Sequence, residues 1–367
     1  MSRINVTKSS MPTYEEYCQE IKKLWDSRWL SNRGVEHKEF EKELCELFDC
    51  EGVSLFANGH VALEVAIDAF DFKEGSEVIT TPYTHCSTTH AIVRNGLKPI
   101  FVDVLDDYLT IDPVQIEKAI TEKTVAIVAT HVYGFPCKVD EIDKIAKKYN
   151  LKVIYDAAHA FGETYNNKPI TSYGDASMIS CHATKVFHTI EGGIIVFKDK
   201  SFYEKVDHLT NFGFVSHEDV AYISTNARMN EFEAAMGLCN LRHFKDDISK
   251  RKKVAERYFE NLSDIKGIRL FIPEDNLDWN CAYFPIIFDG YKYDRNQIQD
   301  KLADNDIYAR KYFYPLTSEL TCYKDEYGYT VKDTPIAKHA AEHVLTLPMY
   351  SDLELEEVDR ICEIIKQ

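Results

Sequence analysis

The chain has 367 residues, of which 45% are hydrophobic, and its formal net charge is −17. This length and composition are typical of a globular protein with one large and one small domain, or two of similar size. The negative charge argues against binding to nucleic acid or to an anionic membrane surface, and no stretch approaches the roughly 18 apolar residues of a membrane span.

The cysteines and the N-terminus indicate where the protein works. Ten cysteines are scattered along the chain without a C-x-x-C pair. A chain of this size builds its core without disulfides. The first residues also lack the hydrophobic core of a signal peptide. We therefore expect reduced thiols and a cytoplasmic protein.

The first 50 residues predict two amphipathic helices separated by a polar turn. Apolar residues recur at helical spacing over residues 14–25 and again over residues 40–48. Between them lies the polar segment WLSNRG at residues 29–34. We expect Trp29 to anchor this N-terminal arm on the body of the protein.

A strand at residues 53–57 and a helix at residues 61–70 are joined by Asn58, Gly59 and His60. A strand-to-helix turn with glycine lets the backbone approach an anion and points free N–H groups at it. This turn is therefore a candidate phosphate cradle, although such a turn more often only reverses the chain.

Further apolar strands are predicted at residues 77–82, 98–104 and 124–129, with helices at residues 112–120 and 139–149. Apolar strands that alternate with helices are typical of βα units. These segments therefore predict a mainly parallel sheet that is buried on both faces.

The strongest chemical signal lies between residues 153 and 193. An apolar strand ends at Asp156, and a second strand at residues 176–180 is followed by a turn that carries Lys185. Two neighbouring strands would bring these side chains to one end of a sheet. Pyridoxal 5'-phosphate (PLP) needs a lysine that bonds to its aldehyde and an acid that keeps its ring nitrogen protonated. An ordinary ion pair between Asp156 and Lys185 is the alternative.

From about residue 245 the pattern changes to charged helices and isolated strands, which predicts a smaller α+β domain. The predicted elements are helices at residues 246–262, 295–305 and 336–344 and strands at residues 283–288 and 345–350.

Two histidines in this part, His339 and His343, stand four residues apart on a predicted helix. That spacing would suit a metal ion. Because no third ligand accompanies them, we interpret them as surface residues and expect no metal site.

The motifs DAAH at residues 156–159 and SCHATK at residues 180–185, followed by EGG at residues 191–193, resemble signatures of the DegT/DnrJ/StrS family. The pieces N-x-R-x-x-E-x-x-A-A-x-G at residues 226–237 and RKYFYPL at residues 310–316 match the same family. The family consists of PLP-dependent sugar aminotransferases, and the resemblance covers nearly the whole chain.

The resemblance implies an α/β protein of PLP fold type I, the aspartate aminotransferase fold. We expect a large PLP-binding domain with a mainly parallel sheet and an N-terminal substrate-side arm at residues 1–245. A small α+β domain is expected at residues 246–367.

The resemblance also implies catalytic roles. Lys185 would bond to the cofactor and later move a proton from the amino donor, and Asp156 would pair with the ring nitrogen. His159 would contact the phenolic oxygen of the ring. Relatives that remove a sugar hydroxyl carry histidine at the lysine position, so Lys185 favours transamination over dehydration.

The cofactor phosphate would be held by Ser180, by the backbone at Gly59 and His60, and by Asn226. In the family, this asparagine comes from the neighbouring subunit, so the resemblance implies a homodimer with shared sites. His60 stands where the family usually has threonine, which removes a hydroxyl from this cradle.

His85 stands where the family places an aromatic residue on the cofactor ring, and a flat imidazole can stack there too. The resemblance further makes His131 and Tyr133 plausible lining residues. It also places the WLSNRG segment, and with it Trp29, beside the substrate entrance.

Arg310, Lys311 and Tyr312 are candidate contacts for an anionic nucleotide sugar, although surface cations are common.

The expected reaction is transamination of a nucleotide-linked keto sugar, with dTDP-4-keto-6-deoxyglucose as acceptor and glutamate as amino donor. The alternatives are a C3 aminotransferase acting on a dTDP-3-keto-6-deoxyhexose, or an enzyme for a UDP- or GDP-linked 4-keto sugar. Two hypotheses come from other functional classes: a PLP-binding regulatory protein without turnover, and a PLP-free Schiff-base lyase. The resemblance also implies that the enzyme serves the biosynthesis of a bacterial surface polysaccharide such as O-antigen lipopolysaccharide.

Overall fold

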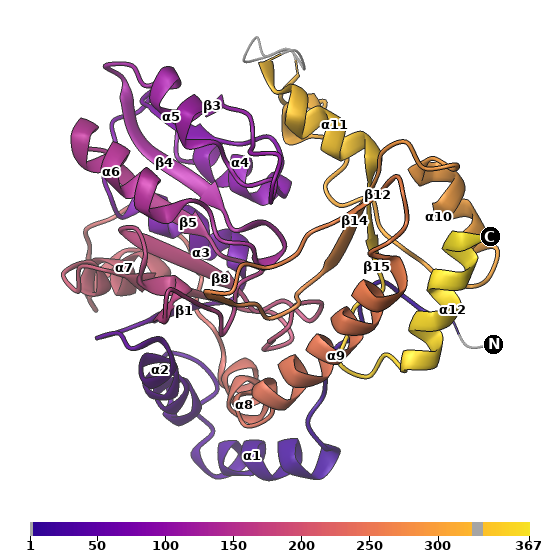
Figure 1. Ribbon diagram of the computed structural model, residues 1–367. Helices are drawn as coiled ribbons and strands as arrows, with labels where there is room; N and C mark the ends of the chain where they lie inside the picture. Colours follow the sequence, from indigo (N-terminus) through magenta and orange to yellow (C-terminus); the bar gives the residue numbers. More distant parts are fainter. Residues whose placement is uncertain (1–2, 325–332) are drawn as a thin grey trace.

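A computed structural model of the chain describes residues 3–324 and 333–367 (Figure 1). All strands of its main sheet run parallel except β9, which is antiparallel to both neighbours. The prediction of an α/β fold with a mainly parallel sheet is confirmed. Across the sheet the strands are β1 (Ser54–Phe56), β9 (Gly193–Phe197), β8 (Ala176–Ser180), β5 (Lys152–Asp156), β4 (Thr124–Thr130), β2 (Glu77–Thr80) and β3 (Lys98–Phe101).

Helices lie on both faces of this sheet. One face carries α3 (Gly59–Asp68), α4 (Cys86–Arg94) and α7 (Phe202–Thr210), and the other carries α5 (Pro113–Ala119) and α6 (Val139–Tyr149). Within β4, Ala126 and Val128 face the first group, whereas Ile127 and Ala129 face the second. Because successive side chains of a strand point to opposite faces, an uninterrupted apolar strand contributes to two cores.

A second sheet lies in the C-terminal part of the chain and is antiparallel, with strands in the order β12 (Ile268–Leu270), β14 (Phe284–Phe288) and β15 (Val344–Leu347). Around it lie α9 (Phe244–Leu262), α10 (Arg295–Ala303), α11 (Pro335–His343) and α12 (Leu355–Lys366) (Figure 1). The N-terminal end reaches the same region, because Ile4 forms a parallel bridge with Ile307.

Short strands form two further antiparallel sheets. One contains β6 (Thr164–Tyr165), β7 (Lys168–Pro169) and β13 (Leu277–Asp278), and the other is the hairpin of β10 (Phe214–Ser216) and β11 (Asp219–Val220). All ten cysteines are free thiols. Across residues 3–324 and 333–367, no helix combines the length and apolarity needed to cross a membrane. The same residues contain no cluster of His, Cys, Asp or Glu suited to a metal ion.

The N-terminal arm consists of α1 (Tyr14–Ser27) and α2 (Val35–Phe48), which pack on α8 (Glu231–Leu241). The small and apolar residues within 225–237 predict a helix from the start of that segment, but α8 begins only at Glu231, because Asn230 and Glu233 form a capping box there. Residues 225–230 are therefore left free to run beside β1, where Arg228 bridges to Phe56.

The carboxylate of Glu231 holds the arm in place. It is buried and accepts the backbone N–H groups of Gly34 and Glu36 at 2.8 Å each and that of His37 at 3.4 Å. Gly34 makes no side-chain cap of its own for α2. A Cβ atom at Gly34 would lie 2.6 Å from the Glu231 carboxyl carbon, so a larger residue there would displace the carboxylate from these hydrogen bonds. A negative charge at a helix N-terminus is favourable, and Glu231 thereby fixes the start of α2.

Replacing Glu231 with alanine is therefore expected to lower the free energy of unfolding by about 2–4 kcal/mol, because it leaves buried N–H donors without acceptors. Chemical denaturation would measure the change. Glu46→Ala, on the exposed face of α2, is the control and is expected to change stability by less than about 0.5 kcal/mol. Equal effects of the two substitutions would contradict this assignment.

Candidate active site

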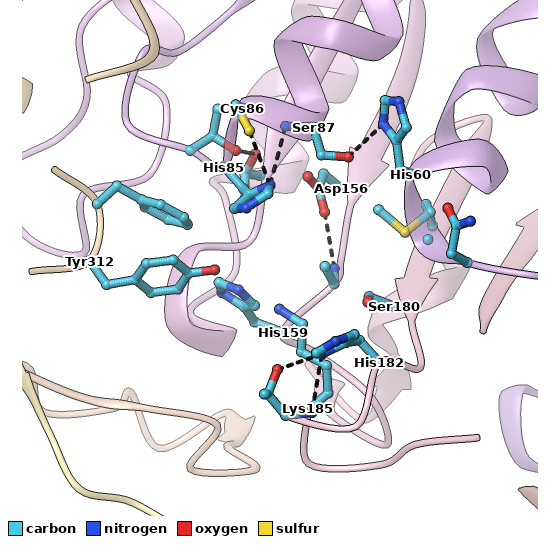
Figure 2. A pocket seen from close by; sticks show the side chains of 18 of the residues that line it. His60, His85, Cys86, Ser87, Asp156, His159, Ser180, His182, Lys185 and Tyr312 are labelled. Atoms are coloured by element: carbon cyan, nitrogen blue, oxygen red, sulfur yellow. Dashed lines mark hydrogen bonds between the residues drawn. The ribbon is translucent and has the colours of Figure 1, made fainter. Parts of the chain in front are cut away.

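A cavity of about 430 Å³ opens at the carboxyl end of the main sheet. It lies where β5 and β8 end and where α3 and α4 begin, and the C-terminal part of the chain closes its far side (Figure 2). The carboxyl ends of strands in open α/β sheets are the usual place for a ligand. Of the residues singled out in the sequence, the cavity brings together Gly59, His60, His85, Asp156, His159, Ser180, Lys185, Arg310 and Tyr312.

Asp156 ends β5 and is held rigidly. Only 3% of its surface is exposed. Its Oδ2 accepts a hydrogen bond from the Thr88 hydroxyl at 2.7 Å, and its Oδ1 accepts the Ala158 N–H at 3.2 Å. Thr88 in turn bonds to the hydroxyl of Thr84 at 2.8 Å. These two hydrogen bonds fix the orientation of the carboxylate, and its remaining acceptor capacity faces the cavity.

Lys185 lies in the turn after β8, on the opposite side of the cavity from Asp156 (Figure 2). Its Nζ stands 5.8 Å from the centroid of the Tyr283 ring, within range of a cation–π contact. Across the part of the chain that the structure describes, no ion pair joins Lys185 to Asp156 or to any other carboxylate. The alternative of an ordinary ion pair is therefore wrong, and both groups stay available to a ligand.

His159 faces the same cavity as a neutral donor. It is buried, and its Nδ1 accepts the N–H of Tyr133 at 3.0 Å. Burial, together with the positive charge of Lys185, keeps the pKa of His159 well below its ordinary value. A neutral ring whose Nδ1 accepts a hydrogen bond carries its proton on Nε2. His159 therefore presents an N–H to a ligand in the cavity.

The N-terminus of α3 forms a cradle with Ser180. The side chain of Asn58 caps the helix by accepting the Val61 N–H at 2.9 Å. A Cβ atom at Gly59 would lie 3.0 Å from the Ser180 Cβ, so glycine permits this close approach. The free N–H groups of Gly59 and His60 and the Ser180 hydroxyl thus border one space, which suits a phosphate.

Among the candidate substrate contacts, only Arg310 and Tyr312 line the cavity. The Arg310 guanidinium lies 4.4 Å from the centroid of the Tyr312 ring. Burial and the neighbouring Tyr283 raise the pKa of the Tyr312 hydroxyl well above its usual value, so it stays protonated. Lys311 lies outside the cavity, as does Trp29, which is 57% exposed.

Three other residues named from the sequence also lie outside the cavity lining. Asn226 is exposed and accepts a hydrogen bond from Arg228 at 3.0 Å. His131 is buried against the Tyr155 ring and accepts the Cys137 N–H. Tyr133 does not line the cavity either, but its backbone N–H sets the proton position of His159, as described above.

Several residues of the site were not singled out from the sequence. Thr88 supports Asp156 from α4, and Tyr283 and Phe313 reach the cavity from the C-terminal part of the chain. Tyr283 lies 4.7 Å from His159 between ring centroids. An aromatic residue at the start of an apolar strand has the same pattern as an ordinary core residue, so periodicity does not single it out.

The residues present fit PLP. A phosphate requires N–H and O–H donors, which the α3 terminus and Ser180 provide. A pyridine nitrogen requires an anchored acid, and an aldehyde requires an amine without an ion-pair partner. Asp156 and Lys185 meet these two needs on opposite sides of one cavity.

A profile of the DegT/DnrJ/EryC1/StrS aminotransferase family matches residues 13–366. The dTDP-4-amino-4,6-dideoxy-D-glucose transaminase of Shigella dysenteriae is 41% identical over 365 residues, which cover 99% of this chain and 98% of that protein. Among solved structures, DesI with its TDP-sugar product gives a TM-score of 0.93 at 29% identity, covering 100% of this chain and 93% of that one. The PLP form of the sugar aminotransferase Spr1654 from Streptococcus pneumoniae gives 0.92 at 26% identity, covering 100% and 98%.

The fold, the chemistry of the cavity and the full-length match agree with one another. They confirm the predicted family, fold class, cofactor and type of reaction. The chain belongs to the DegT/DnrJ/EryC1/StrS aminotransferase family and is a PLP-dependent aminotransferase.

Proposed function

We propose that the protein aminates C4 of dTDP-4-keto-6-deoxyglucose, with glutamate as amino donor, and forms dTDP-4-amino-4,6-dideoxyglucose. The observation that carries the proposal is the cavity in which Lys185, Asp156 and the α3 cradle converge. The full-length similarity to a transaminase named for this product supports the choice of sugar. It also favours this acceptor over a C3 keto sugar or a UDP- or GDP-linked sugar.

When bound, PLP supplies an electron sink that stabilises negative charge on the carbon that loses its proton. The Lys185 amine holds the cofactor and, once released, its Nζ takes the proton from the α-carbon of the amino donor. The ring of Tyr283 borders that amine, with its centroid 5.8 Å from Nζ.

Asp156 keeps a proton on the ring nitrogen, because a fixed negative charge beside a pyridine favours its cationic form. The Thr88 and Ala158 donors hold the carboxylate in that position. We assign to the Nε2–H of His159 a hydrogen bond to the phenolic oxygen of the ring. The Gly59 and His60 N–H groups and the Ser180 hydroxyl bind the phosphate in this assignment.

We further propose a homodimer with shared sites. Large apolar side chains are exposed on two neighbouring loops of the single chain, at Trp29 and Leu30 and at Phe212, Phe214 and Ile223. Arg228 connects these loops, because its guanidinium bonds to Asn32 and Asn211 as well as to Asn226. A second copy of the chain would cover this surface and receive Asn226 at its phosphate cradle.

The free thiols of all ten cysteines are consistent with a cytoplasmic enzyme. A 4-amino-4,6-dideoxy sugar linked to a nucleotide suits the assembly of a surface polysaccharide such as an O-antigen.

The proposed reaction is tested with purified protein, PLP, glutamate and dTDP-4-keto-6-deoxyglucose, with the product identified by NMR. We expect an equatorial amine at C4. Conversion of the 3-keto isomer or of a UDP- or GDP-linked 4-keto sugar at a higher kcat/KM would overturn the choice of acceptor. Failure of glutamate to aminate the bound cofactor would contradict the proposed donor, with alanine and glutamine as the next amino acids to compare.

The shared site makes a separate prediction about subunits. Sedimentation equilibrium is expected to give twice the 42.3 kDa mass of one chain. Asn226→Asp is expected to weaken PLP binding about 10- to 100-fold, because it places a negative charge beside the phosphate.

Mixing Asn226→Asp chains with Lys185→Ala chains tests which subunit supplies the asparagine. If Asn226 acts in the partner's site, random exchange restores about a quarter of all sites to the wild-type residue set. Tight PLP binding and activity then return together. If Asn226 acts within its own chain, no site regains the wild-type residue set, and the mixture shows only the weak PLP binding of the Asn226→Asp chains. Wild-type chains mixed with Lys185→Ala chains provide the reference.

A further inference from the structure

The ring of His85 is fixed in one orientation by the helix that follows it. His85 is the N-cap of α4, and its Nδ1 accepts the backbone N–H of Ser87 at 3.2 Å. A ring nitrogen that accepts an N–H carries no proton of its own. The neutral ring therefore carries its proton on Nε2.

The other edge of the ring faces the cavity. Figure 2 shows the His85 ring extending from α4 into the space bordered by Tyr312 and His159, on the side away from its capping bond. The surrounding protein atoms and the positive charge of Lys185 lower the pKa of His85, which keeps the ring neutral near pH 7. His85 thus presents a fixed N–H to the cavity, which a phenylalanine ring cannot do.

The electrostatic surroundings favour an anionic acceptor for this N–H. Lys185 and Arg310 both place positive charge near His85. Within the described residues, neither cation has a carboxylate partner. Asp156, the negative group that acts on His85, is already engaged by Thr88 and Ala158. A bound carboxylate would accept the His85 N–H and lie close to the two cations, Lys185 and Arg310.

We propose that the Nε2–H of His85 donates a hydrogen bond to a carboxylate of the amino acid donor, with Arg310 as the nearby counter-charge. His85 then selects the amino donor in addition to offering a flat ring for stacking. The inference rests on the proposed transamination, since it requires that an amino acid enter this cavity. A nucleotide sugar could also offer oxygen acceptors, and the experiment separates the two sources.

The test uses the PLP-loaded enzyme and glutarate, a dicarboxylate that has no amine and cannot react. Glutarate binding is followed by the change in cofactor absorbance. His85→Phe keeps a flat ring but removes the donor, so its glutarate Kd is expected to rise about 10- to 100-fold. His339→Phe makes the same chemical change at the stacked pair on α11, far from the cavity, and is expected to leave the Kd unchanged.

NMR of the wild-type enzyme with ¹⁵N-labelled histidine tests the same contact without a substitution. The Nδ1 of His85 is expected at an unprotonated shift, and glutarate is expected to move its Nε2–H resonance, which His85→Phe identifies by its loss. A protonated Nδ1, or a resonance that glutarate does not move, would overturn the proposal.

Two further outcomes separate this inference from the proposed function. If His85→Phe weakens binding of the dTDP-sugar product but not of glutarate, the acceptor belongs to the sugar and the proposal is wrong, although transamination stands. If no amino acid aminates the cofactor while glutarate binding still depends on His85, the proposed function fails and the anion contact remains.

Discussion

The parallel pairing of β5 with β8 is the constraint on which the rest of the site depends. Their register places Asp156 beside Met178, two residues before Ser180 at the end of β8. Because both faces of the sheet are covered by helices, polar side chains reach a ligand only where these strands end. That one edge thereby receives the acid of β5, the hydroxyl of β8 and, from the turn beyond, the amine of Lys185.

Backbone N–H groups set the chemical state of the site. His159 accepts an N–H from Tyr133, and His85 accepts one from Ser87, in each case on Nδ1. Both rings are held neutral beside Lys185, and both carry their proton on Nε2. Cation, anion and two neutral donors therefore coexist in one cavity without neutralising each other. A direct ion pair between Asp156 and Lys185 would have removed two of these functions.

Local patterns predicted much of the fold and the core of the site. The apolar runs of β4, β5 and β8 appear where periodicity places them, and the motifs around Asp156 and Lys185 identified the cofactor. Contacts between distant segments were not predictable in this way. Tyr283 meets His159 across 124 positions (283 − 159) through tertiary packing alone. The start of α8 was also missed, because the capping box at Asn230 competes with the helical pattern before it.

We propose that Asp156 keeps the ring nitrogen of the bound cofactor protonated. NMR of the enzyme loaded with PLP that is ¹⁵N-labelled at the ring nitrogen measures this directly. We expect a protonated nitrogen in the wild type and an unprotonated one in Asp156→Asn, whose amide carries no charge to stabilise the cation. The same nitrogen shift in both proteins would contradict this role of Asp156.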